Sequence, residues 1–171
     1  MTTISTPHLR IDLDILKKNI NKMSIISHKS KLRLIPHAKT HKCAEIAKLL
    51  IKSGAKGISV AKFEEAIFFM NSGIKFIKIC YPMISEKKIL HLLQKAKFFK
   101  VKIFFVIDSE EGFSKLQKIV NKIKVVTNTY IEIDVGFNRC GLNVRNPLLN
   151  NLAIKIKNSK NILLTGITSH A

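Results

Sequence analysis

One lysine of this chain lies where a buried strand is expected to give way to a helix. Residues 32–35 are mostly apolar and predict a short strand, which Pro36 ends because proline cannot donate to a sheet. Thr40 is placed to cap the helix that follows. At such a strand end, desolvation and cationic neighbours favour a neutral lysine amine, so Lys39 could attack a carbonyl carbon. The alternative is an ordinary solvated surface lysine.

Two histidines flank this lysine in the sequence. His37 and His41 have the spacing of two metal ligands on one helical face, but Pro36 places His37 outside the helix, and the chain has no HExxH signature. We therefore expect no metal site in this pair. Instead, both histidines are expected to line a pocket around Lys39 and to influence its charge.

A second candidate cation follows a strand with a clear alternating pattern. Residues 130–134 predict this strand, Gly136 predicts a turn after it, and Arg139 comes next. A guanidinium there would be a permanent charge near the mouth of a barrel. The alternative is a surface arginine in a loop. Gly136 and Gly141 are expected to meet backbone requirements of the turn rather than to contact a ligand.

The rest of the chain alternates regularly between strand and helix patterns. Strands are predicted at residues 33–36, 57–60, 76–80, 102–107, 129–134 and 162–168. Helices are predicted at residues 14–28, with Asp14 as the cap, and at 41–53, 63–71, 86–99, 109–122 and 147–157. Glu45, Glu64 and Glu65 are expected on predicted helices, either on solvated faces or in helix salt bridges. This order indicates an α/β fold with a parallel sheet or barrel, and the alternative is an open doubly wound sheet.

Composition narrows the class of protein. The net charge of +19 raises the question of nucleic acid, but only four of the 30 basic residues are arginines, and they are not clustered. We expect no specific nucleic-acid partner. No apolar run is long enough to cross a membrane. The three cysteines have neither zinc spacing nor the number of a disulfide scaffold, so a cytoplasmic location is expected.

Several segments together resemble one enzyme family. Residues 36–42 (Pro-His-Ala-Lys-Thr-His-Lys) and 134–141 (Asp-Val-Gly-Phe-Asn-Arg-Cys-Gly) carry the resemblance, and residues 11–14, 59–61 and 166–171 extend it in order along the chain. They resemble the D-threonine aldolase and D-serine dehydratase family. Members of this family are fold-type III enzymes that use pyridoxal 5′-phosphate (PLP), and their N-terminal barrel is related to that of alanine racemase.

The resemblance implies a fold and a set of site residues. The fold would be a partial (β/α)₈ barrel of the alanine racemase N-terminal type, with about six of eight strands, so residues 1–171 would form one incomplete PLP-binding domain and the C-terminal β domain would be absent. Lys39 would bind PLP covalently, Arg139 would lie near its phenolic oxygen, His170 would pack against its ring, and His37 would line its pocket. Cys43 stands where alanine racemase has a tyrosine that helps to hold the phosphate.

The resemblance also implies a reaction. The protein would be the N-terminal part of a PLP-dependent lyase that acts on small D-amino acids, either by retro-aldol cleavage or by dehydration of D-serine. A divalent metal, Mn²⁺ or Zn²⁺, would be held only by the C-terminal domain, and the complete form would be a homodimer. The 171 residues alone are expected to bind PLP weakly and to show no turnover. The alternatives are an amino-acid racemase, a non-catalytic PLP-binding protein and an inactive gene fragment.

Overall fold

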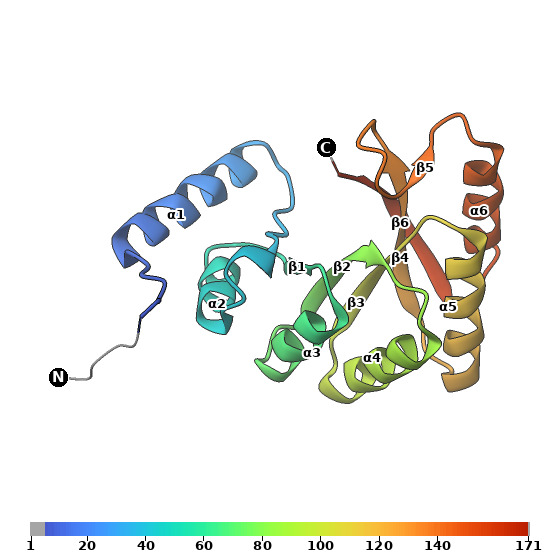
Figure 1. The fold of residues 1–171 in the computed structure, drawn as a ribbon, viewed down its shortest axis with the longest axis horizontal. Helices are drawn as coiled ribbons and strands as arrows, with labels where there is room; N and C mark the ends of the chain where they lie inside the picture. The colour runs from blue at the N-terminus through green and yellow to red at the C-terminus, as the bar shows by residue number, and fades with distance from the viewer. Residues whose placement is uncertain (1–5, 171) are drawn as a thin grey trace.

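A computed structural model describes residues 6–170, which form a curved parallel sheet with helices along one side (Figure 1). Ala171, the last residue of the segment 166–171, lies outside the described residues. The helices are α1 (Leu13–Lys29), the short 3₁₀ helix η1 (Ala38–Thr40), α2 (Ala44–Lys52), α3 (Phe63–Asn71), α4 (Glu86–Phe99), α5 (Glu110–Ile123) and α6 (Pro147–Lys157). The strands are β1 (Ile58–Val60), β2 (Phe76–Pro82), β3 (Lys102–Ile107), β4 (Thr127–Asp134), β5 (Leu142–Asn143) and β6 (Ile162–Ser169).

All strand pairs in the sheet are parallel. The sheet runs from β1 through β2 and β3 to β4, and β6 pairs with the far edge of β4 over most of its length. The two residues of β5 pair with the last two residues of β4, beyond the end of β3. Alternating strands and crossover helices therefore form the α/β barrel-type fold that the sequence predicted.

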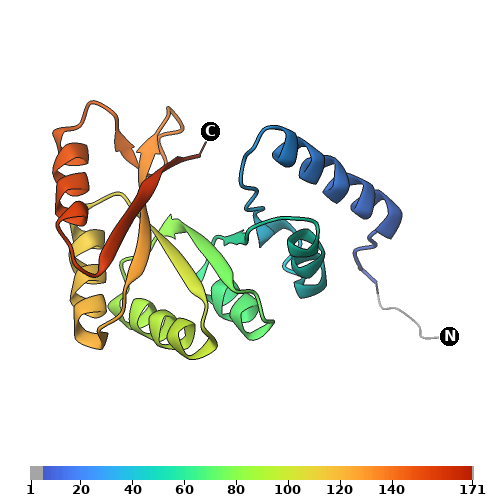
Figure 2. The same ribbon diagram turned by 180° about the vertical axis from the view of Figure 1, so that it is seen from behind.

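The two faces of the sheet have different environments. Helices α3 to α6 follow one another along the outer face, where Ile77, Ile79 and Ile131 join the main hydrophobic core (Figures 1 and 2). The inner face carries an aromatic layer in which the Phe76 ring stacks on Phe104 with centroids 4.3 Å apart. Burial of these apolar side chains stabilises the sheet, and the aromatic layer forms a floor inside the curve.

Residues 33–36 do not form the predicted first strand, but they lie beside β1, at the edge of the sheet. Residues 33–36 run beside β1, and the carbonyls of Leu34 and Pro36 accept hydrogen bonds from Lys56 and Ser59 at 2.9 and 2.7 Å. Beyond these bonds there is one isolated bridge, between His37 and Ser59. Pro36 has no N–H to donate, so the segment supplies acceptors without completing a ladder. In contrast, the two-residue strand β5 was not predicted.

Two predicted helix caps are also wrong. Asp12, not Asp14, caps α1, because the Oδ1 atom of Asp12 accepts hydrogen bonds from the backbone N–H groups of Asp14 and Ile15. Thr40 lies inside η1 instead of capping a helix, and α2 starts later, after Cys43. The chain cannot continue from η1 into α2 as one helix because Lys42 adopts a left-handed conformation with φ of +46°.

The first helix stands apart from the sheet. Both views show α1 on the far side of α2 from the strands (Figures 1 and 2). Of its side chains only Ile20 is buried, whereas Ile15, Met23 and Ile26 are about half exposed. Among residues 6–170, no helix has both the length and the apolar character that a membrane span requires.

Candidate active site

A cavity opens at the carboxyl ends of the strands, and the four predicted site residues all line it. Its volume is about 420 Å³, and Lys39, His37, Arg139 and His170 contribute to its wall. These residues come from η1 and its cap, from the loop between β4 and β5, and from the end of β6. In parallel barrels the carboxyl ends of the strands meet on one side, so residues far apart in the sequence converge there.

Lys39 is held by a short structured turn. It is the central residue of η1, between Ala38, which is buried, and Thr40, which is exposed. The Nδ1 atom of His37 accepts a hydrogen bond from the backbone N–H of Lys39 at 3.2 Å, so His37 acts as the cap of this turn. The Lys39 side chain is exposed at the cavity and is therefore accessible to a small molecule.

The charge state of His37 follows from its surroundings. Burial lowers the pKa of His37 below its ordinary value, and the Lys39 charge lowers this pKa further. The Glu65 carboxylate acts in the opposite direction, while His170 and Lys78 add to the lowering. The ring is therefore neutral at neutral pH, and because Nδ1 accepts a hydrogen bond, the proton of the ring is on Nε2.

The loop that carries Arg139 is shaped by two aspartates and two glycines. The Oδ1 atom of Asp134 accepts hydrogen bonds from the N–H groups of Gly136 and Asn138 at 3.0 and 3.1 Å. Asp108, at the end of β3, accepts one from Gly141 at 3.2 Å. Gly136 and Gly141 have φ of +110° and +100°, which confirms that both serve the backbone of this turn.

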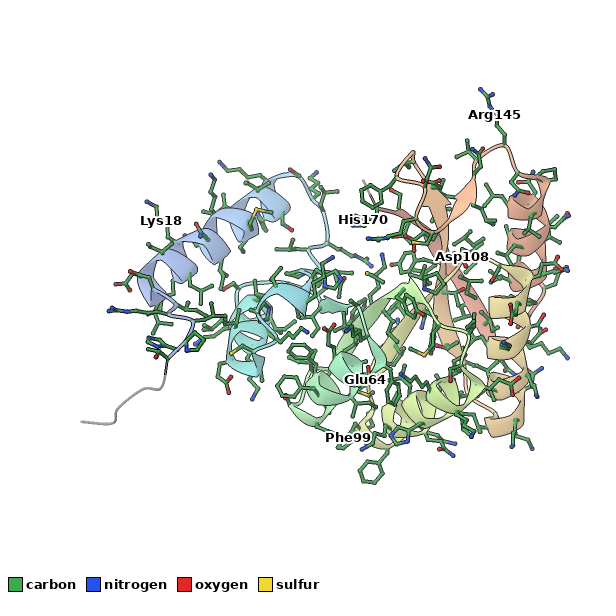
Figure 3. The ribbon with its side chains drawn as sticks, viewed as in Figure 1. Lys18, Glu64, Phe99, Asp108, Arg145 and His170 are labelled. Atoms are coloured by element: carbon green, nitrogen blue, oxygen red, sulfur yellow. The ribbon has the colours of Figure 1, made fainter. Side chains whose placement is uncertain are left out.

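An aromatic ring links this loop to the end of β6. The Arg139 guanidinium lies 5.3 Å from the centre of the Phe137 ring, and the His170 ring lies 5.5 Å from the same ring. Figure 3 shows His170 over the ends of the strands, whereas Arg145 points away from the molecule. Phe137 was not predicted as a site residue, and its place in a loop gave no periodic signal.

Two further wall residues are Glu132, on the inner face of β4, and Cys140, in the loop that follows β4. Glu132 on β4 is only 5% exposed, and its carboxylate accepts a hydrogen bond from the Cys140 thiol at 3.4 Å. Burial raises the pKa of this thiol, as does the Glu132 charge, while Arg139 acts to lower it. The alternation along β4 places Glu132 on the inner face, although it was not predicted as a site residue.

A second lysine lies deeper in the same cavity. The Nζ atom of Lys78 on β2 donates a hydrogen bond to Thr168 of β6 at 2.7 Å and lies 4.5 Å from the centre of the Tyr130 ring. This contact crosses the inside of the curved sheet, directly above the aromatic layer. Lys78 therefore joins β2 to β6 and adds positive charge to the cavity.

The second histidine of the predicted pair does not reach the cavity wall. His41 turns back on its own chain, where its Nδ1 accepts a hydrogen bond from the N–H of Cys43 at 3.0 Å. Burial lowers its pKa. Within the part of the chain that the structure describes, no three His, Cys, Asp or Glu side chains are arranged to hold a metal ion.

Comparisons with known proteins agree on one family. Residues 11–171 match the family described as "Alanine racemase, N-terminal domain". The sequence is 31% identical to a D-threonine aldolase of an Arthrobacter species over 142 residues, 83% of this chain and 37% of that protein. It is 27% identical to a 3-hydroxy-D-aspartate aldolase of Paracoccus denitrificans over 168 residues, 98% of this chain and 43% of that protein.

Comparison with solved structures supports the same family. The structure of a D-threo-3-hydroxyaspartate dehydratase from Delftia sp. HT23 superposes with a TM-score of 0.89 at 27% identity, covering 98% of this chain and 44% of that one. The chain thus spans less than half the length of the relatives it matches. Because the family match covers nearly all of the sequence, the chain belongs to the alanine racemase N-terminal domain family.

Proposed function

We propose that this chain forms the N-terminal, PLP-binding part of a lyase that acts on D-amino acids. The observation that carries the proposal is the convergence of a lysine amine, an arginine and two histidines on one cavity at the carboxyl ends of the strands. Support comes from the relatives, whose names include a D-threonine aldolase, a 3-hydroxy-D-aspartate aldolase and a D-threo-3-hydroxyaspartate dehydratase.

The residues of the cavity fit PLP. An aldehyde needs an accessible primary amine, and the Lys39 side chain is exposed at the wall. An anionic cofactor needs cations, and Lys78 and Arg139 supply two more, while Glu132 is the one carboxylate among the lining residues that the structure describes. A flat ring needs flat neighbours, and His170 offers an imidazole face.

Each residue has a definite role in this proposal. Lys39 would hold the cofactor covalently through its amine, and the free amine would move a proton at the substrate carbon. Arg139 would lie near the phenolic oxygen of the cofactor and would stabilise its negative charge. His170 would pack against the ring. When bound, PLP supplies an electron sink for the bond that breaks next to the amino group.

His37 keeps the Lys39 turn in place. Its Nδ1 binds the backbone N–H of Lys39, so the lysine leaves the turn from a fixed point. A neutral imidazole so close to Lys39 adds no positive charge to the site at neutral pH, whereas an imidazolium would repel the ammonium form of the lysine. His37 can also exchange a proton through Nε2.

Two lyase reactions fit this site, and each has its own substrate and products. Retro-aldol cleavage of D-threonine gives glycine and acetaldehyde, and dehydration of D-serine gives pyruvate and ammonia. The second candidate is a racemase, which the name of the matched family favours. A divalent metal would need ligands beyond the ones the structure describes in this chain.

The proposal is tested on the enzyme to which this barrel portion belongs, with PLP and Mn²⁺ or Zn²⁺. D-threonine, D-serine, 3-hydroxy-D-aspartate and D-alanine are supplied separately. We expect an aldehyde or a keto acid from at least one hydroxy amino acid, and a Lys39→Ala variant should abolish it. Formation of L-alanine from D-alanine, without either product from the hydroxy acids, would favour the racemase instead.

A further inference from the structure

A buried glutamate on α3 contacts the loop that carries Lys39. The sequence pattern predicts that Glu65 lies on a solvated helix face or in a helix salt bridge, but its side chain is only 9% exposed and its partners lie on other segments. Its neighbour Glu64 is exposed and pairs with Lys88 at 2.8 Å. A carboxylate is rarely buried without partners, because it loses its hydration. The partners of Glu65 therefore indicate why it is there.

Both oxygens of Glu65 have partners from other segments. Oε2 accepts a hydrogen bond from the backbone N–H of Ala61 at 2.8 Å, and Oε1 lies 3.3 Å from the ammonium nitrogen of Lys42. Ala61 follows β1 and lines the cavity, while Lys42 ends the turn that carries Lys39. Glu65 thus joins the two segments that form one side of the candidate site.

The Lys42 end of this link is a strained position. Lys42 has φ of +46°, a conformation that costs free energy in an L-residue, and its N–H donates to the carbonyl of Ala38 at 2.9 Å. This geometry separates η1 from α2 and sets the direction in which the Lys39 turn leaves the fold. The Glu65 carboxylate offsets the strain through a charge-assisted contact with the side chain of the same residue.

The charge of Glu65 is retained despite burial. Burial would raise the pKa of Glu65, but the Ala61 hydrogen bond and the Lys42 ammonium together outweigh it and hold this pKa below its ordinary value. The carboxylate also acts on the site itself, since its charge opposes the lowering of the His37 pKa. An ionised Glu65 is therefore part of the electrostatic environment of the Lys39 turn.

We infer that Glu65 is a positioning residue for Lys39: its carboxylate fixes Lys42 and Ala61, and so holds the Lys39 amine where a PLP aldehyde meets it. This inference rests on the proposed function, because it concerns the same lysine. A purely structural role would need only the hydrogen bond to Ala61, which a neutral side chain can accept. The positioning role needs the negative charge that faces Lys42.

The test measures where PLP attaches. The chain is incubated with PLP, reduced with borohydride and digested, and the adduct at Lys39 is divided by the adduct at Lys18, an exposed lysine on α1 (Figure 3). Glu65→Gln keeps an acceptor for Ala61 and removes the charge. We expect it to retain the urea midpoint and to lower the Lys39 to Lys18 ratio on the order of tenfold, the scale of a small misplacement.

Companion variants keep the test decisive. Lys42→Met should lower the ratio as much as Glu65→Gln, and the double variant should lower it no further, because both remove one contact. Glu64→Gln is the matched control and should leave the ratio unchanged. Glu65→Gln, Lys42→Met and Glu64→Gln each change one charge without truncating the side chain to a methyl group, so the test does not depend on a cavity-forming variant at Glu65.

The outcomes separate the two proposals. A high ratio in the unaltered chain with an equal ratio in Glu65→Gln would overturn the positioning role and leave the proposed function standing. A Lys39 to Lys18 ratio near one in the unaltered chain would mean that Lys39 reacts like an ordinary surface lysine. It would overturn the proposed function and this inference with it. A fall in the ratio for Glu65→Gln and Lys42→Met but not for Glu64→Gln would support the positioning role.

Discussion

At the scale of single residues, the cavity depends on which groups carry charge near neutral pH. Lys39, Lys78 and Arg139 bring positive charge to the wall, and His37 is kept neutral by burial and by the charge of Lys39. A site of this kind attracts an anionic cofactor before any covalent bond forms. It also makes the contribution of each cation measurable by substitution.

The two loop arginines provide the first matched pair. Arg139→Ala removes the guanidinium from the cavity wall, and we expect PLP to be held about tenfold more weakly or worse, since a charge-assisted contact contributes roughly 1.5–3 kcal/mol. Arg145→Ala removes a charge that points away from the molecule (Figure 3). Titration of both variants with PLP, followed by absorbance, checks the difference. Equal weakening would place Arg139 among the ordinary surface cations.

The histidines predict a specific pH dependence. The pKa values of His37 and His41 are both lowered by burial from an ordinary value of 6.5, so the unfolded chain takes up their protons first. The free energy of unfolding should therefore have its full value above about pH 6.5 and should fall as the pH drops below this value.

Urea unfolding at several pH values, between neutral and mildly acidic, measures this dependence. His37→Asn keeps a side-chain acceptor for the Lys39 N–H while removing the titrating ring, and His41→Asn does the same for Cys43. Each variant should flatten the fall in stability, and the double variant should flatten it most. A double variant with the unaltered slope would show that other groups cause the acid sensitivity.

At the scale of elements, the loop between β4 and β5 shows how backbone geometry places a functional group. Asp134 and Asp108 fix the loop through its N–H groups, and the two glycines allow its positive φ angles. The surroundings of the glycines differ. A Cβ atom on Gly141 would lie 2.7 Å from the backbone nitrogen of Asp134, whereas one on Gly136 would have nothing within 4 Å.

This difference predicts unequal costs of the same substitution. Gly136→Ala should destabilise the fold by the cost of a disfavoured φ alone, roughly 1–3 kcal/mol. Gly141→Ala should cost more, because the added methyl also overlaps the backbone of β4. The free energy of unfolding in urea measures both. A Gly141→Ala variant no less stable than Gly136→Ala would mean that the loop relaxes freely.

The elements also show how far sequence reasoning reaches. Hydrophobic period and turn residues predicted β1, β2, β3, β4, β6 and most helices, because those signals are local. The segment 33–36 was wrongly predicted as a strand, and the strand β5 was missed. Both errors arise because strand pairing depends on neighbours far along the chain. Glu65 was placed at the surface because helix periodicity does not reveal a partner such as Lys42 on another segment. Phe137 was missed for a related reason, as its contact with His170 exists only once β6 lies beside β4.

At the scale of the whole molecule, the last strand leaves apolar surface in contact with water. Among residues 6–170, β6 pairs only with β4, so its other edge has no strand beside it. Leu163, Leu164 and Ile167 on this strand are exposed, Ile167 by 70%. An open edge with apolar side chains favours pairing with another copy of the chain.

We therefore predict that this edge drives self-association. Ile167→Lys should reduce the weight-average mass in sedimentation measurements at physiological ionic strength, where repulsion from the net charge of +19 is partly screened. Ile154→Lys makes the same change at an exposed position on the helix α6 instead of on the strand. It should leave the association unchanged, and an equal effect of both variants would point to charge rather than to the strand edge.

The high net charge also determines how the binding of PLP by Lys39 must be measured, because salt concentration has to be varied. PLP is an anion and will react weakly with many lysines of so basic a chain, but salt screens that attraction more than it weakens a covalent bond in a shaped cavity. The direct measurement is borohydride reduction with substoichiometric PLP at low and high salt, followed by peptide mapping. We expect Lys39 to carry most of the adduct and to keep its share as salt rises, and we expect Lys39→Ala to lose the absorption band of the bound cofactor. Adduct concentrated at another lysine, with the band intact in Lys39→Ala, would contradict the proposal that Lys39 is the lysine that binds PLP.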